Sequence, residues 1–287
     1  MATVKVVECP RDAWQDREFI PTDVKLEYIR RVRAAGIRHI DAVGFYQSFP
    51  DAEALAQGLR QSDGVEIIAV VTTDAGLERA LANPSITTVA YPYSISAHYR
   101  RANANLSRAE SREMAGRMKQ ATRAAGRGFA VTLAMAFGNP WNEPWGPEIL
   151  IEALEWLKDI GVNTVSLHDT AGIADAELVA QVYSDVKDAV AGVELGVHLH
   201  SHPEEAGDKV LGAYAAGCRR FDCAFGGLGE CYFAGDARMG NLPTETVVAT
   251  LQGQSAQLDI DPGNFAEALA YAEEIRSKYR ENLAHDH

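Results

Sequence analysis

Apolar residues recur along the chain with two alternating spacings. Short runs rich in Val, Ile and Phe, apolar at successive positions, are separated by longer stretches in which apolar residues return every three or four positions. The first pattern is typical of buried strands and the second of amphipathic helices. The predicted strands cover residues 4–8, 38–42, 65–71, 86–91, 129–136, 163–167, 194–200 and 219–224.

A helical stretch follows each predicted strand. Helices are expected at 23–35, 51–61, 76–82, 108–125, 147–160, 175–191, 203–216 and 243–252, with an additional C-terminal helix at 263–284. Parallel strands need crossover connections, and helices of this length supply them. The pattern predicts an α/β fold, a closed (β/α)8 TIM barrel that forms one domain over residues 1–287. A doubly wound open sheet is the alternative, but no Gly-x-Gly-x-x-Gly follows the first strand.

Composition and charge narrow the range of partners. Of the 287 residues, 47% are hydrophobic, which suffices for one large core. The 27 basic and 40 acidic residues give a formal charge of -13, so we expect no nucleic-acid partner. No apolar run approaches the ~18 residues of a membrane span, and no signal-peptide segment is evident. We therefore expect a cytoplasmic protein with no membrane contact.

The seventh predicted strand ends with two histidines. Its sequence is Gly196-Val-His-Leu-His200, and the two-residue period of a strand places His198 and His200 on one face. In a TIM barrel the active site lies at the carboxyl ends of the strands. Two imidazoles one alternation apart suit a shared divalent metal, and a hydrogen-bonded pair of pocket histidines is the alternative.

Two further strand ends bring oxygen ligands toward these histidines. Asp12 follows the first strand and Asn241 follows the eighth. Strand 8 of a closed barrel lies beside strand 1, so both side chains can approach the metal. Two imidazoles, one carboxylate and one amide oxygen favour Mg²⁺ or Mn²⁺ over zinc. An ordinary loop ion pair is the alternative explanation for the adjacent Arg11 and Asp12.

A glycine-rich stretch, Phe225-Gly-Gly-Leu-Gly-Glu-Cys231, follows the eighth strand. A phosphate-binding loop would account for the glycines. A mobile loop that carries Cys231 over the pocket also accounts for the thiol, which can transfer a proton. The adjacent Glu230 would raise the pKa of Cys231 and keep it protonated.

The other three cysteines carry no such signal. Cys9, Cys218 and Cys223 form no Cys-x-x-Cys pair with each other or with Cys231, and we expect all four to be free thiols. Cys218 and Cys223 are interpreted as small core residues.

Four motifs together resemble those of the 3-hydroxy-3-methylglutaryl-CoA (HMG-CoA) lyase family. This family belongs to the metal-dependent barrels that include homocitrate synthase, isopropylmalate synthase and 4-hydroxy-2-oxovalerate aldolase. The motifs are Glu8-Cys-Pro-Arg-Asp-Ala-Trp-Gln15, Ser166-Leu-His-Asp-Thr-Ala-Gly172, Gly196-Val-His-Leu-His200, and Gly227-Leu-Gly-Glu-Cys231 with Gly240-Asn241. They follow the family's order, and the loop cysteine is the feature that singles out the lyase branch.

The resemblance implies a role for each matching residue. The implied metal ligands are Asp12, His198, His200 and Asn241. Arg11 would stabilise enolate charge, and Cys231 would lie on the mobile catalytic loop. Asp169 corresponds to a strand-6 acid that orients the metal shell and a proton-transfer group. Gln15 would line the substrate pocket, and Asp41, which stands where the family usually has Glu, would be a further catalytic residue.

The chain also departs from the family's motifs at three places. The segment Phe45-Tyr-Gln-Ser-Phe-Pro50 lacks the usual Ser-Pro-Lys, the loop has Gly-Glu-Cys in place of Gly-Gly-Cys, and Ser201-His202 replaces Asp-Thr. We expect these differences to affect which substrate is bound and to leave the metal and enolate chemistry intact.

The activity implied by the resemblance is that of a divalent-metal-dependent carbon–carbon lyase. Such an enzyme cleaves an HMG-CoA-like thioester to acetyl-CoA and a keto acid such as acetoacetate. His198, or a residue linked through Asp169, would take the hydroxyl proton; Arg11 would stabilise the enolate oxygen and Cys231 would protonate its carbon. The partner is then a small acyl-CoA or hydroxy acid substrate, and a homodimer is left open.

Two alternatives remain open at this point. A metal-dependent aldolase or an acyl-condensing enzyme of the same superfamily would act on a 2-oxo acid. A non-catalytic metal-binding barrel would act as a partner protein, although a scaffold would not need Arg11, Asp12, the His-x-His pair and Asn241 together.

Overall fold

Eight parallel strands close into a barrel in the order β1-β2-β3-β4-β5-β6-β7-β9. The computed structural model describes residues 3–15, 19–59, 64–229, 231, 233 and 238–279. The barrel strands are β1 (Lys5–Glu8), β2 (His39–Phe45), β3 (Glu66–Val71), β4 (Thr88–Ser94), β5 (Gly128–Ala134), β6 (Thr164–His168), β7 (Glu194–His198) and β9 (Arg220–Cys223). The predicted TIM barrel is confirmed.

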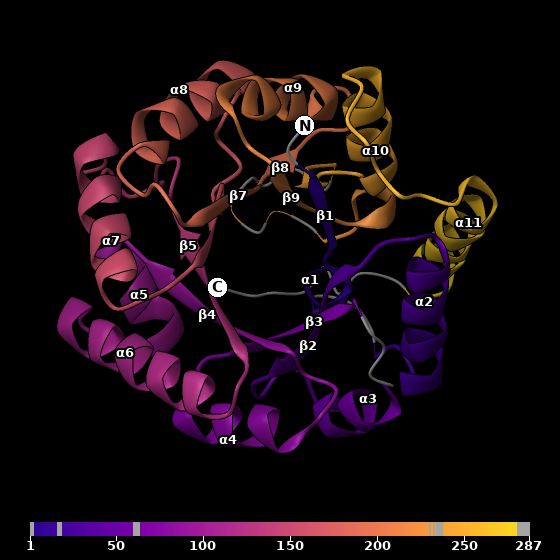
Figure 1. Cartoon of the computed structure of the whole chain (residues 1–287), viewed down its shortest axis with the longest axis horizontal. Helices are drawn as coiled ribbons and strands as arrows, with labels where there is room; N and C mark the ends of the chain where they lie inside the picture. The colour runs from indigo at the N-terminus through magenta and orange to yellow at the C-terminus, as the bar shows by residue number, and fades with distance from the viewer. Residues whose placement is uncertain are drawn as a thin grey trace.

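Helices surround the barrel as a ring (Figure 1). They are α1 (Pro10–Trp14), α2 (Thr22–Ala34), α3 (Ala52–Gly58), α4 (Asp74–Ala82), α5 (Ala97–Ala104), α6 (Arg108–Ala124), α7 (Pro147–Asp159), α8 (Ala176–Lys187), α9 (Ala206–Ala216), α10 (Thr244–Gly253) and α11 (Pro262–Lys278). The short 3-10 helix η1 (Phe225–Gly227) follows β9. Among the described helices, none is long and apolar enough to cross a membrane.

The barrel closes where β1 pairs with β9. Lys5 to Glu8 align with Arg220 to Cys223, one residue against one. On its other side β9 pairs with β7, where His198 lies opposite Asp222. The carboxyl ends of β7, β9 and β1 are therefore neighbours, as expected from closure.

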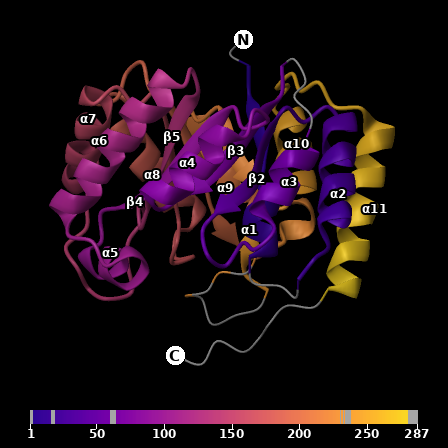
Figure 2. The same ribbon diagram turned by 90° about the horizontal axis from the view of Figure 1, so that it is seen from below.

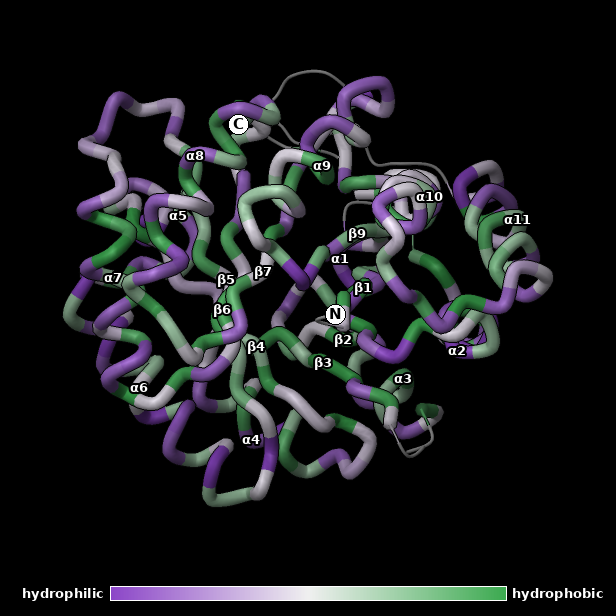
Figure 3. The backbone as a smooth tube through the Cα atoms, turned by 45° about the horizontal axis from the view of Figure 1, so that its top comes forward, coloured by the Kyte–Doolittle hydropathy of each residue, from purple (hydrophilic) through white to green (hydrophobic). Residues whose placement is uncertain are grey.

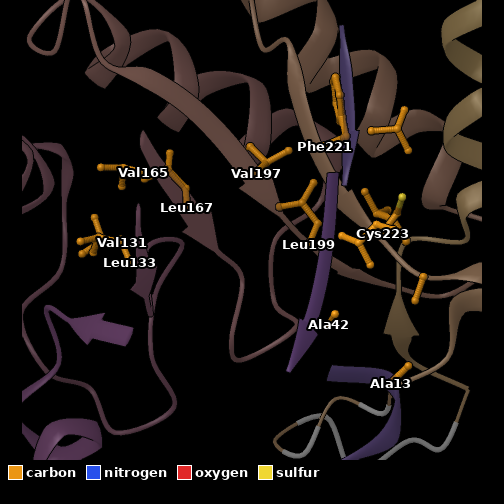
Figure 4. Packing of buried hydrophobic residues seen from close by; sticks show 14 of the residues in the cluster. Ala13, Ala42, Val131, Leu133, Val165, Leu167, Val197, Leu199, Phe221 and Cys223 are labelled. Atoms are coloured by element: carbon orange, nitrogen blue, oxygen red, sulfur yellow. The ribbon is translucent and has the colours of Figure 1, made fainter. Parts of the chain in front are cut away.

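Both faces of the strands are apolar because each face packs against other side chains. Figure 4 shows outward-facing residues of β5, β6 and β7 and the residue that follows β7. They are Val131, Leu133, Val165, Leu167, Val197 and Leu199, which belong to the main buried cluster. A smaller apolar cluster lies in the barrel interior and consists of Val7, Cys9, Ile68, Val70, Ala90 and Ala130. In Figure 3, hydrophobic segments run through the central strands while hydrophilic ones recur on the outer helices. Burial of each Val or Leu contributes about 1.5–3 kcal/mol.

The C-terminal helix α11 lies beside α2 on the outside of the barrel (Figures 1 and 2). Asp261 caps α11, because its side chain accepts a 2.8 Å hydrogen bond from the amide of Asn264. The additional C-terminal helix is thereby confirmed. Its predicted end at 284 lies outside the described residues.

Several predicted element ends differ from the structure for local reasons. The pattern ends the fourth strand before Pro92, yet β4 continues to Ser94, which pairs with Ala134 of β5. Strand β5 ends at Ala134 rather than 136 because Met135 has a φ of 61°. The helices α1 and α5 were not predicted. Residues 60–63, which include the predicted end of the helix at 51–61, lie outside the described part.

The seventh strand is also shorter than predicted. β7 ends at His198, and His200–Ser201 form β8, which leaves the barrel and pairs antiparallel with β10 (Gly240–Asn241). In this register Asn241 lies opposite His200.

Candidate active site

Four side chains from separate segments meet at the carboxyl end of the barrel. Asp12 comes from α1, directly after β1; His198 ends β7; His200 lies in β8 and Asn241 in β10. Oxygen or nitrogen atoms of Asp12, His198 and His200 all lie within 4.8 Å of one another. Asn241 Nδ2 donates hydrogen bonds to Asp12 Oδ2 at 2.9 Å and to the Leu228 carbonyl at 2.7 Å. The structure thus brings together the four residues predicted as metal ligands.

This cluster fits a hard divalent cation. Asn241 Oδ1 and His200 Nδ1 are buried without a hydrogen-bond partner among the described residues. Such unpaired atoms are costly unless something is bound to them. Although burial raises the pKa of Asp12, the charges of Arg11 and His198 lower it to about 2. Burial and the neighbouring His198 lower the pKa of His200 to about 4. One carboxylate and one neutral imidazole are therefore available as ligands at neutral pH.

The close approach of the loop to these ligands depends on Gly229. Its φ is 97°, and a Cβ at this position would lie 2.4 Å from Asn241 Nδ2 and 3.2 Å from Asp12 Oδ2. Gly226 and Gly227 also have positive φ values, of 66° each. The sequence interpretation was that these glycines make the loop mobile. In the structure all three glycines adopt left-handed backbone conformations, and Gly229 allows the tight approach to the ligand side chains.

His198 lies between two carboxylates. Its Nε2 is 3.9 Å from Asp12 Oδ2, and its Nδ1 is 3.6 Å from Asp222 Oδ2. Ser166 donates a 2.7 Å hydrogen bond to the same Asp222 oxygen. Burial lowers the pKa of His198, but the interactions with Asp222 and Asp12 more than offset this and raise it. Such a carboxylate behind a histidine fixes which ring nitrogen faces a metal.

A second histidine stacks on His198. The rings of His168 and His198 are 4.2 Å apart and nearly parallel, at 8°. Burial and the adjacent histidines hold the pKa of His168 well below its ordinary value. Sequence reasoning assigned no role to His168 or to Asp222. For Asp222, the sequence signal that could have pointed to a role is its position as an acidic residue inside the apolar strand predicted at 219–224.

Arg11 is anchored by Asp41. Arg11 Nε lies 3.1 Å from both Asp41 carboxylate oxygens, and Nη2 lies 2.6 Å from Oδ2. The remaining nitrogen, Nη1, makes longer contacts to Asp12 at 3.4 Å, Gln15 at 3.3 Å and Tyr46 at 3.5 Å. Burial lowers the pKa of Arg11, but the interactions with Asp41, Tyr46 and Asp12 together outweigh burial and raise the pKa. Arg11 is therefore a fixed cation beside the cluster, with Gln15 at its outer edge.

Asp169 faces away from the cluster. Its carboxylate accepts hydrogen bonds from the amides of Ile173 and Ala174, each at 3.1 Å, in the loop after β6. Strand alternation turns the neighbouring His168 inward instead. The contact of Asp169 with the site is through its backbone, because its amide donates to the carbonyl of His198 at 2.9 Å.

Cys231 lies against the loop that follows β6. It is buried, with Sγ 3.7 Å from the Thr170 carbonyl, and its amide donates to the Met239 carbonyl at 2.9 Å. A Cβ on Gly172 would come within 2.8 Å of Sγ. Glu230, predicted to keep the thiol protonated, lies outside the described residues. The other three cysteines are buried in the protein, and all four are free thiols.

The closed barrel and the ligand cluster at its carboxyl end define a TIM-barrel enzyme with a candidate divalent-metal site. A family model described as HMGL-like matches residues 9–271, and the chain belongs to that family. It is 30% identical over 265 residues to the cytoplasmic 3-hydroxy-3-methylglutaryl-CoA lyase of Danio rerio, covering 90% of this chain and 78% of that protein.

Two other similarities agree with this family. The (R)-citramalyl-CoA lyase of Chloroflexus aurantiacus is 29% identical over 278 residues, covering 91% of this chain and 87% of that protein. The crystal structure of the HMG-CoA lyase from Brucella melitensis superposes with a TM-score of 0.89 at 27% identity, covering 97% of this chain and 100% of that one. The predicted family and the predicted enzyme class, a carbon–carbon lyase, are confirmed.

Proposed function

We propose that this chain cleaves a 3-hydroxy-3-methylglutaryl-CoA-like thioester to acetyl-CoA and a keto acid such as acetoacetate. The observation that carries the proposal is the cluster of Asp12, His198 and His200 with the fixed cation Arg11 beside it. Similarity to HMG-CoA lyases and to a citramalyl-CoA lyase supports an acyl-CoA thioester as the substrate class.

Asp12, His198, His200 and Asn241 would hold the cation, with Mg²⁺ or Mn²⁺ as the ions that suit this donor set. When bound, the ion supplies Lewis-acid polarisation of a substrate oxygen and a template for the substrate. Asp222 keeps His198 oriented through its Nδ1, and Asn241 is held in place through its Nδ2. These residues prearrange the ligands before any ion arrives.

Arg11 stabilises the enolate that forms when the C2–C3 bond breaks. Asp41 occupies two of its nitrogens and fixes the guanidinium plane, which leaves Nη1 directed at Gln15, Asp12 and Tyr46. A cation held in place at the site of developing charge acts mainly on the transition state. Gln15, which contacts both Arg11 and Asp12, lines the substrate side of this arrangement.

The substrate's hydroxyl proton and the product's new C–H proton require separate groups. As a cation ligand, His198 has both ring nitrogens engaged, one by the cation and one by Asp222. The neutral imidazole of His168, which stacks on His198, therefore supplies the acceptor of the hydroxyl proton. C–C cleavage then yields the ketone and the thioester enolate, and the Cys231 thiol protonates the enolate carbon. The imidazole's proton returns to the Cys231 thiolate, so that no proton is gained or lost. Asp169 assists by holding the backbone of the β6 loop beneath Cys231.

The test is a product analysis with a panel of substrates. Purified protein with Mg²⁺ or Mn²⁺ is incubated with 3-hydroxy-3-alkylglutaryl-CoA thioesters, citramalyl-CoA and 4-hydroxy-2-oxo acids, and the products are identified by mass spectrometry. The expected result is metal-dependent release of acetyl-CoA and a keto acid from a thioester. Cleavage of the 4-hydroxy-2-oxo acids alone would instead assign a metal-dependent aldolase.

Three finer features belong to the same proposal. The bound ion is Mg²⁺ or Mn²⁺, the protein acts in the cytoplasm, and its oligomeric state is a homodimer. Metal analysis of the purified protein, fractionation of the source cells and light scattering test these features in turn.

A further inference from the structure

Tyr46 follows β2 at the mouth of the barrel. Its ring packs against the interior cluster that includes Val7, Cys9 and Ile68. It also lies across Gly44, because a Cβ built on Gly44 would come 2.3 Å from Tyr46 Cε1 and 2.7 Å from its hydroxyl oxygen. Only a residue without a side chain at position 44 allows this placement, so Gly44 and Tyr46 fit together as a pair.

The Tyr46 hydroxyl meets the one nitrogen of Arg11 that Asp41 does not occupy. Arg11 Nη1 donates to the Tyr46 oxygen at 3.5 Å. A phenol that accepts through its oxygen still has its own hydrogen to donate. Burial raises the pKa of Tyr46 above its ordinary value of about 10, so that hydrogen stays in place at neutral pH. The turn from Tyr46 to Phe49 fixes the ring further, since the two rings meet edge-on at 6.1 Å.

We propose that Tyr46 is a catalytic residue whose hydroxyl, together with Arg11 Nη1, binds the thioester enolate oxygen. Two donors 3.5 Å apart can both lie about 2.7–3.1 Å from a single oxygen atom. This inference rests on the proposed lyase function, because it assigns the pair to the enolate of that reaction. No bond to Tyr46 forms or breaks; its hydrogen bond strengthens as the enolate charge develops.

Replacement of Tyr46 by Phe removes only the hydroxyl. We expect Tyr46→Phe to lower kcat by about 10²-fold or more, the usual effect of losing one oxyanion donor, with KM and Mn²⁺ affinity near the wild-type values. Tyr91→Phe is the matched control, because its buried hydroxyl bonds Ser111 at 3.0 Å on the outer side of the barrel. That control keeps the wild-type kcat.

A second variant moves the ring and keeps the hydroxyl. Gly44→Ala places a methyl group where the Tyr46 ring lies, so kcat falls while circular dichroism and metal affinity stay at wild-type values. Both substitutions act on the same hydroxyl. In the double variant of Gly44→Ala with Tyr46→Phe, we therefore expect the fold-loss of kcat to equal that of Tyr46→Phe alone, and not the product of the two single fold-losses.

Binding of an enolate mimic separates this inference from the proposed function. The probe is the nitronate isostere of acetyl-CoA, with acetyl-CoA itself as the uncharged reference. Tyr46→Phe should weaken nitronate binding by about 10²-fold and leave acetyl-CoA binding unchanged.

If wild-type protein cleaves thioesters while Tyr46→Phe matches it in kcat and nitronate affinity, the role proposed for Tyr46 is wrong and the proposed function stands. If wild-type protein cleaves no thioester, the proposed function fails, and the nitronate ratio still decides the role of Tyr46. A wild-type protein that binds neither compound overturns both.

Discussion

At the scale of single residues, Arg11 shows how a buried charge is reserved for one task. Asp41 takes two of its three nitrogens, and burial of both partners excludes water from the pair. The geometry matches a planar guanidinium and would not suit an ammonium group. The arrangement therefore gives a sharp expectation for a conservative replacement.

We expect Arg11→Lys to lose most activity, with kcat reduced by about 10²–10³-fold, because lysine cannot contact Asp41 in two places and also reach the enolate oxygen. Mn²⁺ affinity, measured by electron paramagnetic resonance, should change little. An equal loss of metal affinity would instead assign Arg11 the structural task of holding Asp12.

Cys231 is the predicted functional thiol of the four. We expect Cys231→Ala and Cys231→Ser to lower kcat by about 10²–10⁴-fold, the effect of removing a positioned acid, with metal binding retained. Cys218→Ala serves as the control, because its buried thiol bonds the Arg220 carbonyl outside the site. Wild-type turnover of Cys231→Ala on the true substrate would favour the aldolase alternative.

The neighbours His168 and Asp169 show how far a sequence motif can predict which side chain faces the site. The motif Ser166-Leu-His-Asp-Thr carried the resemblance and pointed to Asp169. In the structure Asp169 holds loop amides, and His168 stacks on His198. Alternation fixes that two neighbours face opposite sides, but which of them faces inward depends on how the strand sits in the barrel.

At the scale of elements, the short pair β8–β10 positions half of the candidate ligands. His200 leaves the barrel after β7, and antiparallel pairing with Gly240–Asn241 sets Asn241 opposite it. The sequence analysis predicted that closure of the barrel places the seventh, eighth and first barrel strands side by side, and these strands are β7, β9 and β1. The pairing of two segments of two residues each follows from tertiary contacts, because neither segment has enough length for a strand pattern.

Glu8 connects four elements near the bottom of the site. Its buried carboxylate accepts hydrogen bonds from Tyr28 of α2 at 2.6 Å, Thr244 of α10 at 2.6 Å and the Phe225 amide of η1 at 2.9 Å. Burial raises its pKa to about 7, although these three donors oppose the shift. The folded state therefore favours the neutral acid.

A pKa raised on folding has a definite consequence for stability. Protonated Glu8 contributes its full share to the free energy of unfolding below the ordinary pKa of Glu, and this contribution is lost as the pH rises through about 7. We expect Glu8→Gln, a neutral isostere, to gain stability relative to wild type between pH 5 and 8.5, by on the order of 3 kcal/mol at the upper end. Urea unfolding at several pH values measures this difference.

The control for Glu8 is the partly exposed carboxylate of Glu27. The hydrogen bonds from Arg30 and Arg31 lower the pKa of Glu27 to about 2, so Glu27→Gln should leave the pH dependence above pH 5 unchanged. Parallel pH profiles for wild type and Glu8→Gln would contradict the prediction.

At the scale of the whole molecule, metal binding links distant parts of the barrel. The candidate ligands come from α1, β7, β8 and β10, so an ion bound by all four segments stabilises the folded chain and not one loop. At an ion concentration of 100 times Kd, this linkage contributes about 2.7 kcal/mol. The corresponding rise in Tm is about 4–5 °C, because the unfolding entropy of a 287-residue chain is about 0.6 kcal/mol/K.

Calorimetry with Mn²⁺ and with EDTA measures this rise. We expect His200→Ala to abolish the metal-dependent shift while its Tm in EDTA stays close to that of wild type. His202→Ala, a histidine two positions further along the chain, should keep the shift. Equal shifts in wild type and His200→Ala would rule out His200 as a ligand.

The sequence by itself determined the barrel, the order of its strands and the end at which the polar residues gather. These follow from hydrophobic periodicity, which is local and repeated, and from the rule that parallel strands expose their carboxyl ends together. Only the tertiary structure decided that Asp222 and His168 accompany His198, that Asp169 faces a loop, and that Tyr46 reaches Arg11 across Gly44. Those relations depend on distances between segments far apart in the chain, and such distances are set by packing and register, which no local pattern encodes.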